Sequence, residues 1–93
     1  MKATWNGTLI AQSDDTVVVD GNHYFPADSL NREYVTFSNT RTSNPWKGEA
    51  KYYSLLVNGE LKADAIWYYP DPKPDAEMLR GRVAFGNGIK IEP

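Results

Sequence analysis

The sequence contains no cysteine and only one histidine, His23, among its 93 residues. Without thiols there can be no disulfide framework, no thiolate zinc site and no thiol nucleophile. A lone histidine cannot assemble a metal site without help from distant carboxylates. We therefore predict a protein that binds no metal, needs no cofactor and depends on packing alone for its stability.

Blocks of like charge and long apolar runs are also missing. The formal charge is −2 at pH 7, and the charged residues are spread along the chain. Such a chain lacks the electrostatic footprint of a protein that binds nucleic acid or an anionic membrane. Residues 1–7 lack the apolar run of a signal peptide, and no later stretch approaches a membrane span. We expect a cytoplasmic protein, monomeric by default, with neither nucleic acid nor a membrane as partner.

Aromatic residues, in contrast, are abundant, with three Trp, six Tyr and three Phe. A chain of this length buries only about 60 to 65% of the surface that its unfolded form exposes, so its core is thin. Each aromatic ring can bury roughly 150 to 250 Å². We predict a single domain over residues 1–93 whose core is dominated by aromatic side chains.

Four Asx-Gly pairs punctuate the chain, at Asn6-Gly7, Asp20-Gly21, Asn58-Gly59 and Asn87-Gly88. These pairs tolerate the positive φ of two-residue hairpin turns, and each is flanked by strand-like residues. We predict a hairpin at each pair, with strands near residues 2–5, 8–12, 16–19, 22–25, 34–38, 49–57, 66–69, 82–85 and 89–92.

The remaining segments complete the predicted fold. Residues 39–45 are rich in Asn, Ser and Thr without periodicity, which favours a loop. Only residues 28–31 and 75–79 favour helical turns, the second with Asp75 as N-cap. Residues 49–57 are partly apolar on both faces, which suits a bent sheet. We predict an all-β fold, a small bent antiparallel sheet or half-open barrel, with at most one or two short helical turns.

Three segments in this order and spacing resemble the domain-of-unknown-function 427 family. They are Asn-His-Tyr-Phe-Pro at 22–26, the Pro-Trp-Lys-Gly core followed by Tyr-Tyr within 44–53, and Trp-Tyr-Tyr-Pro at 67–70. The match spans nearly the whole chain, and the combination is fairly specific. The resemblance implies a tent-like all-β fold of the type shared with methionine sulfoxide reductases of the B class and the drug-binding domain of cereblon. It implies no established activity.

Two residues depart from the family pattern, whose loop commonly reads Thr-His-Thr, one residue, then Cys-Pro-Trp-Lys-Gly. Here Arg41 stands in the His place and Asn44 in the Cys place. Cys-His chemistry therefore cannot run in this protein unless other residues replace both roles, and the reductase analogy fails for the same reason. A nucleotidyltransferase label has also been attached to the family. Such enzymes need clustered carboxylates to bind magnesium. The pair Asp14-Asp15 reads as a solvated turn instead.

Lys47 stands out because it lies between Trp46 and Gly48 where a loop meets a strand. Burial would favour its uncharged amine, a nucleophile or base, but a lysine here can equally pair with a carboxylate. Trp46 is expected to pack inward as the anchor of the loop. Gly48 permits a sharp twist, so we predict that Lys47 overhangs the main cleft and that both residues lie on its rim or wall.

Neighbouring residues of a strand point to opposite faces, so Tyr52 and Tyr53 must diverge, as must Tyr68 and Tyr69. One tyrosine of each pair is predicted to enter the core, which leaves the other for a site or the surface. His23 is a candidate for proton transfer, because histidine titrates near neutral pH.

Two classes of function stay open, with a third that depends on the surface. The first is a small-molecule-binding module whose aromatic-lined cleft involves Trp46, Lys47, Tyr53, Trp67 and His23. The second is an enzyme in which Lys47 acts as base or Schiff-base nucleophile, with Tyr53 or His23 as proton donor. A protein-interaction domain would need an exposed apolar patch, which sequence cannot show.

Overall fold

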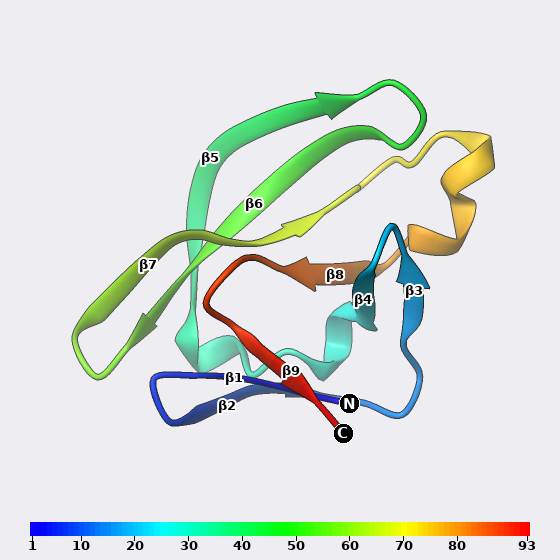
Figure 1. The fold of residues 1–93 in the computed structure, drawn as a ribbon. Helices are drawn as coiled ribbons and strands as arrows, with labels where there is room; N and C mark the ends of the chain where they lie inside the picture. Colours follow the sequence, from blue (N-terminus) through cyan, green and yellow to red (C-terminus); the bar gives the residue numbers. More distant parts are fainter.

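The computed structural model describes residues 1–93 as two antiparallel sheets without a closed barrel, and 58% of the residues lie in strands (Figure 1). The predicted all-β class is confirmed. The nine strands are β1 (Lys2–Trp5), β2 (Thr8–Gln12), β3 (Val17–Val19), β4 (Asn22–Pro26), β5 (Val35–Asn44), β6 (Gly48–Val57), β7 (Glu60–Tyr68), β8 (Arg82–Phe85) and β9 (Lys90–Glu92).

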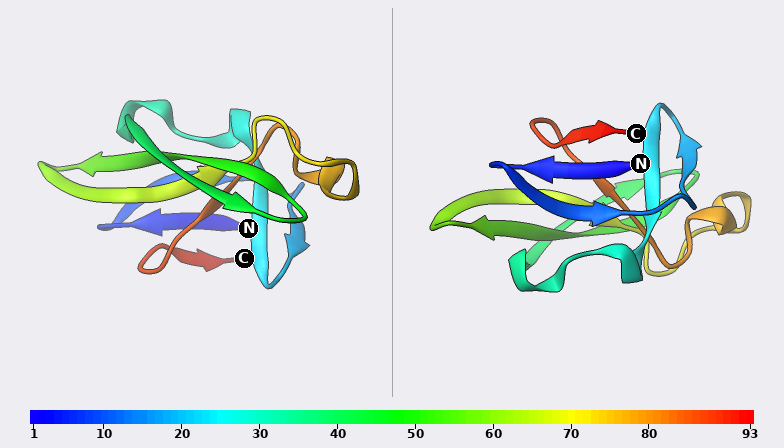
Figure 2. Two further views of the ribbon diagram at one scale, coloured as in Figure 1. Left: turned by 90° about the horizontal axis from the view of Figure 1, so that it is seen from above. Right: turned by 90° about the horizontal axis from the view of Figure 1, so that it is seen from below.

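The smaller sheet has the order β2-β1-β9, and the larger has the order β3-β4-β8-β7-β6-β5. The larger sheet is narrow at its middle, because β8 pairs through only two residue positions with β4 and two with β7. Figure 2 shows the result, with β4 running crosswise to the long strands β6 and β7. This bend is what the partly apolar faces of residues 49–57 predict.

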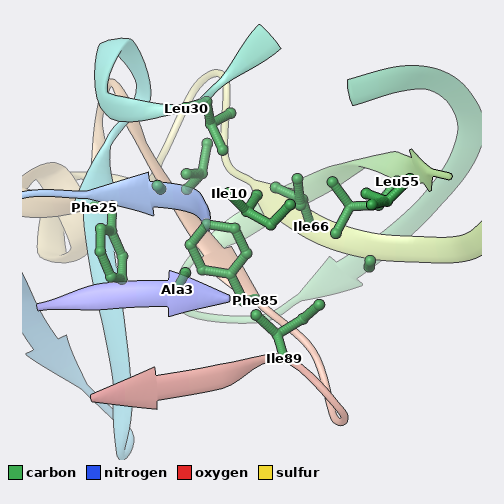
Figure 3. Close-up of a cluster of buried hydrophobic side chains, with 12 residues drawn as sticks. Ala3, Ile10, Phe25, Leu30, Leu55, Ile66, Phe85 and Ile89 are labelled. Carbon is green, nitrogen blue, oxygen red and sulfur yellow. The ribbon is translucent and has the colours of Figure 1, made fainter. Parts of the chain in front are cut away.

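The main hydrophobic core fills the space between the two sheets (Figure 3). Phe25 of β4 and Phe85 of β8 meet edge to face, with ring centroids 5.2 Å apart, and aliphatic side chains from β2, β6 and β7 pack around them. The fully buried members include Ile10, Leu55 and Ile66. The core is thus mixed aliphatic and aromatic, whereas the sequence predicts aromatic dominance: of its twelve buried residues only Phe25 and Phe85 are aromatic, and Tyr34, Tyr53 and Tyr68 pack against it while only partly buried.

Three of the four Asx-Gly pairs form the predicted hairpins. Asn6, Asp20 and Asn58 adopt φ values of 52°, 52° and 51°, and each following glycine also has positive φ. Both central residues of a type I′ turn require this conformation, which asparagine, aspartate and glycine tolerate best. These turns join β1 to β2, β3 to β4 and β6 to β7.

The hairpin predicted at Asn87-Gly88 is wrong. Only the glycine has positive φ there, and a turn bond from the Ile89 N–H to the Gly86 carbonyl bends the chain away. As a result β8 stays in the larger sheet while β9 crosses to the smaller one and pairs with β1. The two ends of the chain therefore lie close together (Figure 1).

The loop predicted over residues 39–45 is also wrong for most of its length. Strand β5 continues to Asn44 and pairs with β6 as far as the Asn44–Gly48 pair, with an irregularity between Phe37 and Arg41. Its polar composition reflects its position as an edge strand, where most side chains face water. An edge strand needs no apolar periodicity, so the sequence pattern does not reveal it.

The helical turns are short and of 3₁₀ type: η1 (Ala27–Ser29), η2 (Arg32–Tyr34) and η3 (Pro74–Leu79). The sequence predicts turns near η1 and η3 but not η2. This extra element is a single turn closed by one hydrogen bond, from the Tyr34 N–H to the Asn31 carbonyl. Asp75 is not the N-cap, since η3 begins at Pro74 and has no side-chain cap. No helix is long and apolar enough to cross a membrane.

Candidate functional site

A cavity of about 230 Å³ lies where the connector between β4 and β5 faces the bent sheet. Its walls come from η1, η2, β6, the end of β7 and the start of β8. The nine lining residues are Ala27, Arg32, Tyr53, Tyr68, Tyr69, Pro70, Gly81, Arg82 and Val83.

Two tyrosines are brought together by the register of β6 and β7. Tyr68 pairs with Lys51, so Tyr53, two residues further along β6, lies diagonally across on the same face. Their rings stack with centroids 4.8 Å apart and planes 18° apart. The pair also packs against the main core, which fixes it as a rigid wall of the cavity.

Arginines supply the charge of the cavity. The Arg32 guanidinium lies over the Tyr53 ring, 5.5 Å from its centroid, within the range of a cation–π interaction. Arg82 is held elsewhere: its guanidinium donates to the Asp15 backbone carbonyl at 2.6 Å and carboxylate at 3.2 Å, and to the Tyr24 carbonyl at 3.3 Å. Arg82 therefore presents an occupied guanidinium to the site.

The tyrosines of the cavity differ in acidity. Burial would raise the pKa of Tyr53, but its contacts with the Arg32 guanidinium and the Tyr68 hydroxyl outweigh burial and lower that pKa. Burial, aided by the neighbouring Tyr53, raises the pKa of Tyr68 to about 12. Burial also raises the pKa of Tyr69 to about 12, with help from Tyr24 and Tyr52. Tyr53 is thus the phenol of this group that ionises first.

These pKa values predict a loss of stability at alkaline pH. The folded protein holds the Tyr68 and Tyr69 protons more tightly than the unfolded chain, whose tyrosines titrate near 10.0. Their stabilising contribution is complete below about pH 10 and is lost as the pH rises toward 12. Tyr53 opposes this loss of stability. Its pKa is lower in the folded protein than in the unfolded chain, so its ionisation at alkaline pH favours the folded state. The urea concentration at the unfolding midpoint should decrease as the pH is raised from about 10 to 12. The decrease should be smaller in Tyr68→Phe. A flat profile would contradict the assignment.

Of the five residues predicted for the site, only Tyr53 lines the cavity. Trp46 and Lys47 line neither this cavity nor the open polar hollow at residues 71–80. Their expected roles are reversed, since Trp46 is 39% exposed and Lys47 only 6%. The reason is a partner distant in sequence: the Lys47 ammonium binds the Asp20 carboxylate at 2.5 Å, and it lies 5.1 Å from the Trp46 ring centroid.

Local backbone contacts fix Lys47 in this buried position. Its carbonyl accepts a hydrogen bond from the Lys73 N–H at 3.0 Å. Gly48 follows with a φ of 111°, and a Cβ at that position would lie 3.3 Å from the Asp71 carbonyl oxygen. Glycine is needed there because the 71–73 segment passes so closely.

Trp67 faces away from Tyr53 because of the pleat of the sheet. Trp67 pairs with Tyr52, so both point to the face opposite Tyr53 and Tyr68. There they pack, with the buried Tyr69, against a second and smaller cluster. The alternation predicted for the two tyrosine pairs thus divides the aromatic residues between two faces, and a cleft lined by both Tyr53 and Trp67 is not formed.

His23 lies in the β3–β4 hairpin, where its Nδ1 is 3.0 Å from the Thr16 hydroxyl. It does not line the cavity. The indole N–H of Trp67 donates to the Tyr24 hydroxyl at 3.2 Å. The contact of His23 thus helps to hold the hairpin in place, and that of Trp67 helps to hold the smaller cluster.

The two positions that depart from the family pattern lie outside the cavity as well. The Asn44 side-chain oxygen accepts hydrogen bonds from the Trp46 and Lys47 N–H groups, each at 3.0 Å. This closes the turn between β5 and β6. Arg41 lies 3.9 Å from the Glu49 carboxylate, and both side chains are exposed. Both residues thus make structural contacts.

Acidic residues do not cluster in this structure, and no three His, Asp or Glu side chains lie close enough to hold a metal ion together. Asp15 pairs with Arg82 at 3.2 Å, and its side chain is exposed. Arg80 pairs with Glu77 and Asp71. These three carboxylates are therefore used in surface ion pairs.

The fold and the cavity define a small all-β domain with one tyrosine- and arginine-lined hollow. The chain belongs to the family described as domain of unknown function (DUF427), whose model matches residues 1–92. The resemblance seen in the sequence is thereby confirmed. Among curated proteins no match was found.

Arg32 and Tyr68 line the cavity but were not among the residues predicted for the site. Strand alternation marks Tyr68 or Tyr69 as available, but the choice of Tyr68 depends on the β6–β7 register. Arg32 lies in η2, a single turn without a cap signal, and reaches the site only because the chain folds back there. No local sequence pattern indicates that position.

Proposed function

We propose that the protein is a small-molecule-binding module, and that its site is the cavity between η2 and the β6–β7 strands. One observation carries the proposal: the stacked Tyr53–Tyr68 wall, the Arg32 guanidinium and apolar side chains converge on one concavity. Ligand sites combine apolar walls with a few placed polar groups in this way. The volume lies below the range of about 300 to 1,000 Å³ typical of drug-sized ligands, so the ligand is small.

The alternative of an enzyme that uses Lys47 as base or nucleophile has less support. A substrate that reached Lys47 would have to displace the Asp20 carboxylate from a side chain that is only 8% exposed. An enzyme built on this fold would find its base in Tyr53 instead, since its pKa is lowered beside Arg32 and Tyr68. This second candidate uses the same cavity, with Tyr68 as proton donor.

We propose a cytoplasmic location, because a chain without cysteine cannot form the disulfides that stabilise many small proteins in oxidising compartments. We further propose that the protein works as a monomer, without nucleic acid as a partner.

An NMR screen of small aromatic and heteroaromatic molecules at about 1 mM tests the site. Hits should shift the amide signals of Tyr53, Tyr68 and Val83. Replacing Ala27 with leucine places three more carbons in the cavity wall and should abolish these shifts. The control Ala63→Leu adds the same group at an exposed position outside the lining and should keep them. Hits confined to Trp46 and Lys47 would refute the assignment.

A further inference from the structure

The lining of the cavity is positively charged and contains no acid. Of its nine residues two are arginines and none is Asp or Glu. A third arginine, Arg41, acts on the site from outside, since its charge lowers the pKa of Tyr68 against the larger effect of burial. Two carboxylates act on the lining from outside: Asp15 is paired with Arg82, and Asp20, which is paired with Lys47, contributes to the raised pKa of Tyr69. The cavity therefore favours a negatively charged occupant.

The two lining arginines differ in what they offer. Arg82 already donates to Asp15 and Tyr24, and its side chain is 18% exposed. Arg32 is exposed and makes no ion pair with any carboxylate of the chain. Its guanidinium is held over the Tyr53 ring and also interacts with the Tyr53 hydroxyl, so its position is set while its remaining donors face no carboxylate of the chain. A guanidinium in this state binds a carboxylate through two parallel hydrogen bonds.

The other lining residues determine which chemical groups the uncharged part of the ligand can carry. Ala27, Pro70 and Val83 are apolar, and the two stacked phenol rings add further apolar surface. The hydroxyls of Tyr53 and Tyr68 are the polar groups next to the guanidinium. An occupant that matches this pattern carries one charged end and a small apolar body.

We propose that the cavity binds a small hydrophobic carboxylate, with Arg32 holding the carboxylate and the stacked tyrosines contacting the apolar body. The inference rests on the proposed function and names its ligand class.

Benzoate and benzamide form the test pair, because they share a shape and differ in charge. Both are titrated into the protein, and the amide signals of Tyr53, Tyr68 and Val83 are followed by NMR. Benzoate should bind about tenfold or more tightly, since hydrogen bonds to charged groups are the stronger class. In Arg32→Gln the preference should disappear. In Lys90→Gln, which loses one positive charge at an exposed position outside the lining, the preference should persist.

A second measurement on the unaltered protein does not depend on a variant. Bound benzoate should raise the pKa of Tyr53, because an anion beside Arg32 opposes the ionisation of the phenol. The change is followed in the ring signals of Tyr53 by NMR titration with and without benzoate, because phenolate absorbance sums over all six tyrosines, and benzamide should leave the Tyr53 titration in place.

Four results would overturn the inference, in distinguishable ways. Equal affinity for the two molecules rejects the anion and keeps the cavity as a binding site. A benzoate preference that survives in Arg32→Gln, or an unchanged Tyr53 titration, rejects the role of Arg32. Failure of both molecules and of the wider screen to shift any lining residue rejects the proposed function together with its ligand class.

Discussion

Replacing Phe25 with alanine is expected to lower the free energy of unfolding by about 3 to 5 kcal/mol. Phe25 is fully buried and meets Phe85 edge to face. It also lies opposite Val83 in the ladder of two residue pairs that joins β4 to β8. The substitution opens a void at the narrowest part of the larger sheet, where few other contacts can compensate. A domain of this size has little stability in reserve, so much of the variant should be unfolded.

The matched control is Phe37→Ala, which removes the same ring from an exposed position. Phe37 is 80% exposed in the edge strand β5, and a surface change of this kind usually stays within about 0.5 kcal/mol. Urea denaturation followed by tryptophan fluorescence measures both variants. Similar losses in the two would mean that the core described between the sheets is not the main source of stability.

The Asp20–Lys47 ion pair should respond unequally to loss of its two partners. Asp20→Asn leaves the Lys47 ammonium without its counter-charge on a side chain that is 8% exposed. Removal of one partner from a fully buried pair costs about 3 to 5 kcal/mol. Asp20 itself is 58% exposed, so solvent screens this pair and the expected cost is about 2 kcal/mol. Asparagine keeps the turn, because it tolerates the positive φ at this position.

Lys47→Met should cost less, within about 1 kcal/mol, because methionine fills the space of the stem and leaves an aspartate that water can solvate. The double variant should resemble Lys47→Met alone, and melting and urea curves of all three complete the cycle. If Lys47→Met is the more damaging single change, the stem packing rather than the charge pairing controls the stability of this turn.

The elements that the sequence predicted well are those with local causes. Asn6-Gly7, Asp20-Gly21 and Asn58-Gly59 form turns because two neighbouring residues must both adopt positive φ. Asn87-Gly88 has the same letters, yet the route of the chain there is set by pairing of β9 with β1 at the other end of the molecule. A pair of residues can specify a turn but not the strand that the chain meets next.

The candidate site was only partly predictable for a related reason. Alternation along a strand shows that Tyr52 and Tyr53 diverge, but the choice of face depends on the register with β7. That register places Trp67 with Tyr52 and separates it from Tyr53. In the same way Lys47 is buried because Asp20, 27 residues earlier, reaches it from another hairpin. Such contacts are tertiary, and no spacing within the segment 44–48 encodes them.

The narrow joint at β8 has a consequence for motion. The β3–β4 hairpin joins the rest of the larger sheet through the pairs Phe25–Val83 and Pro26–Arg82, and proline donates no hydrogen bond. Elements attached by few backbone bonds open locally at lower free energy than the whole molecule. The cavity lies at this joint, with Ala27 on one side and Gly81 to Val83 on the other. An occupant that touches both sides would slow hydrogen exchange in the hairpin beyond the residues that it contacts.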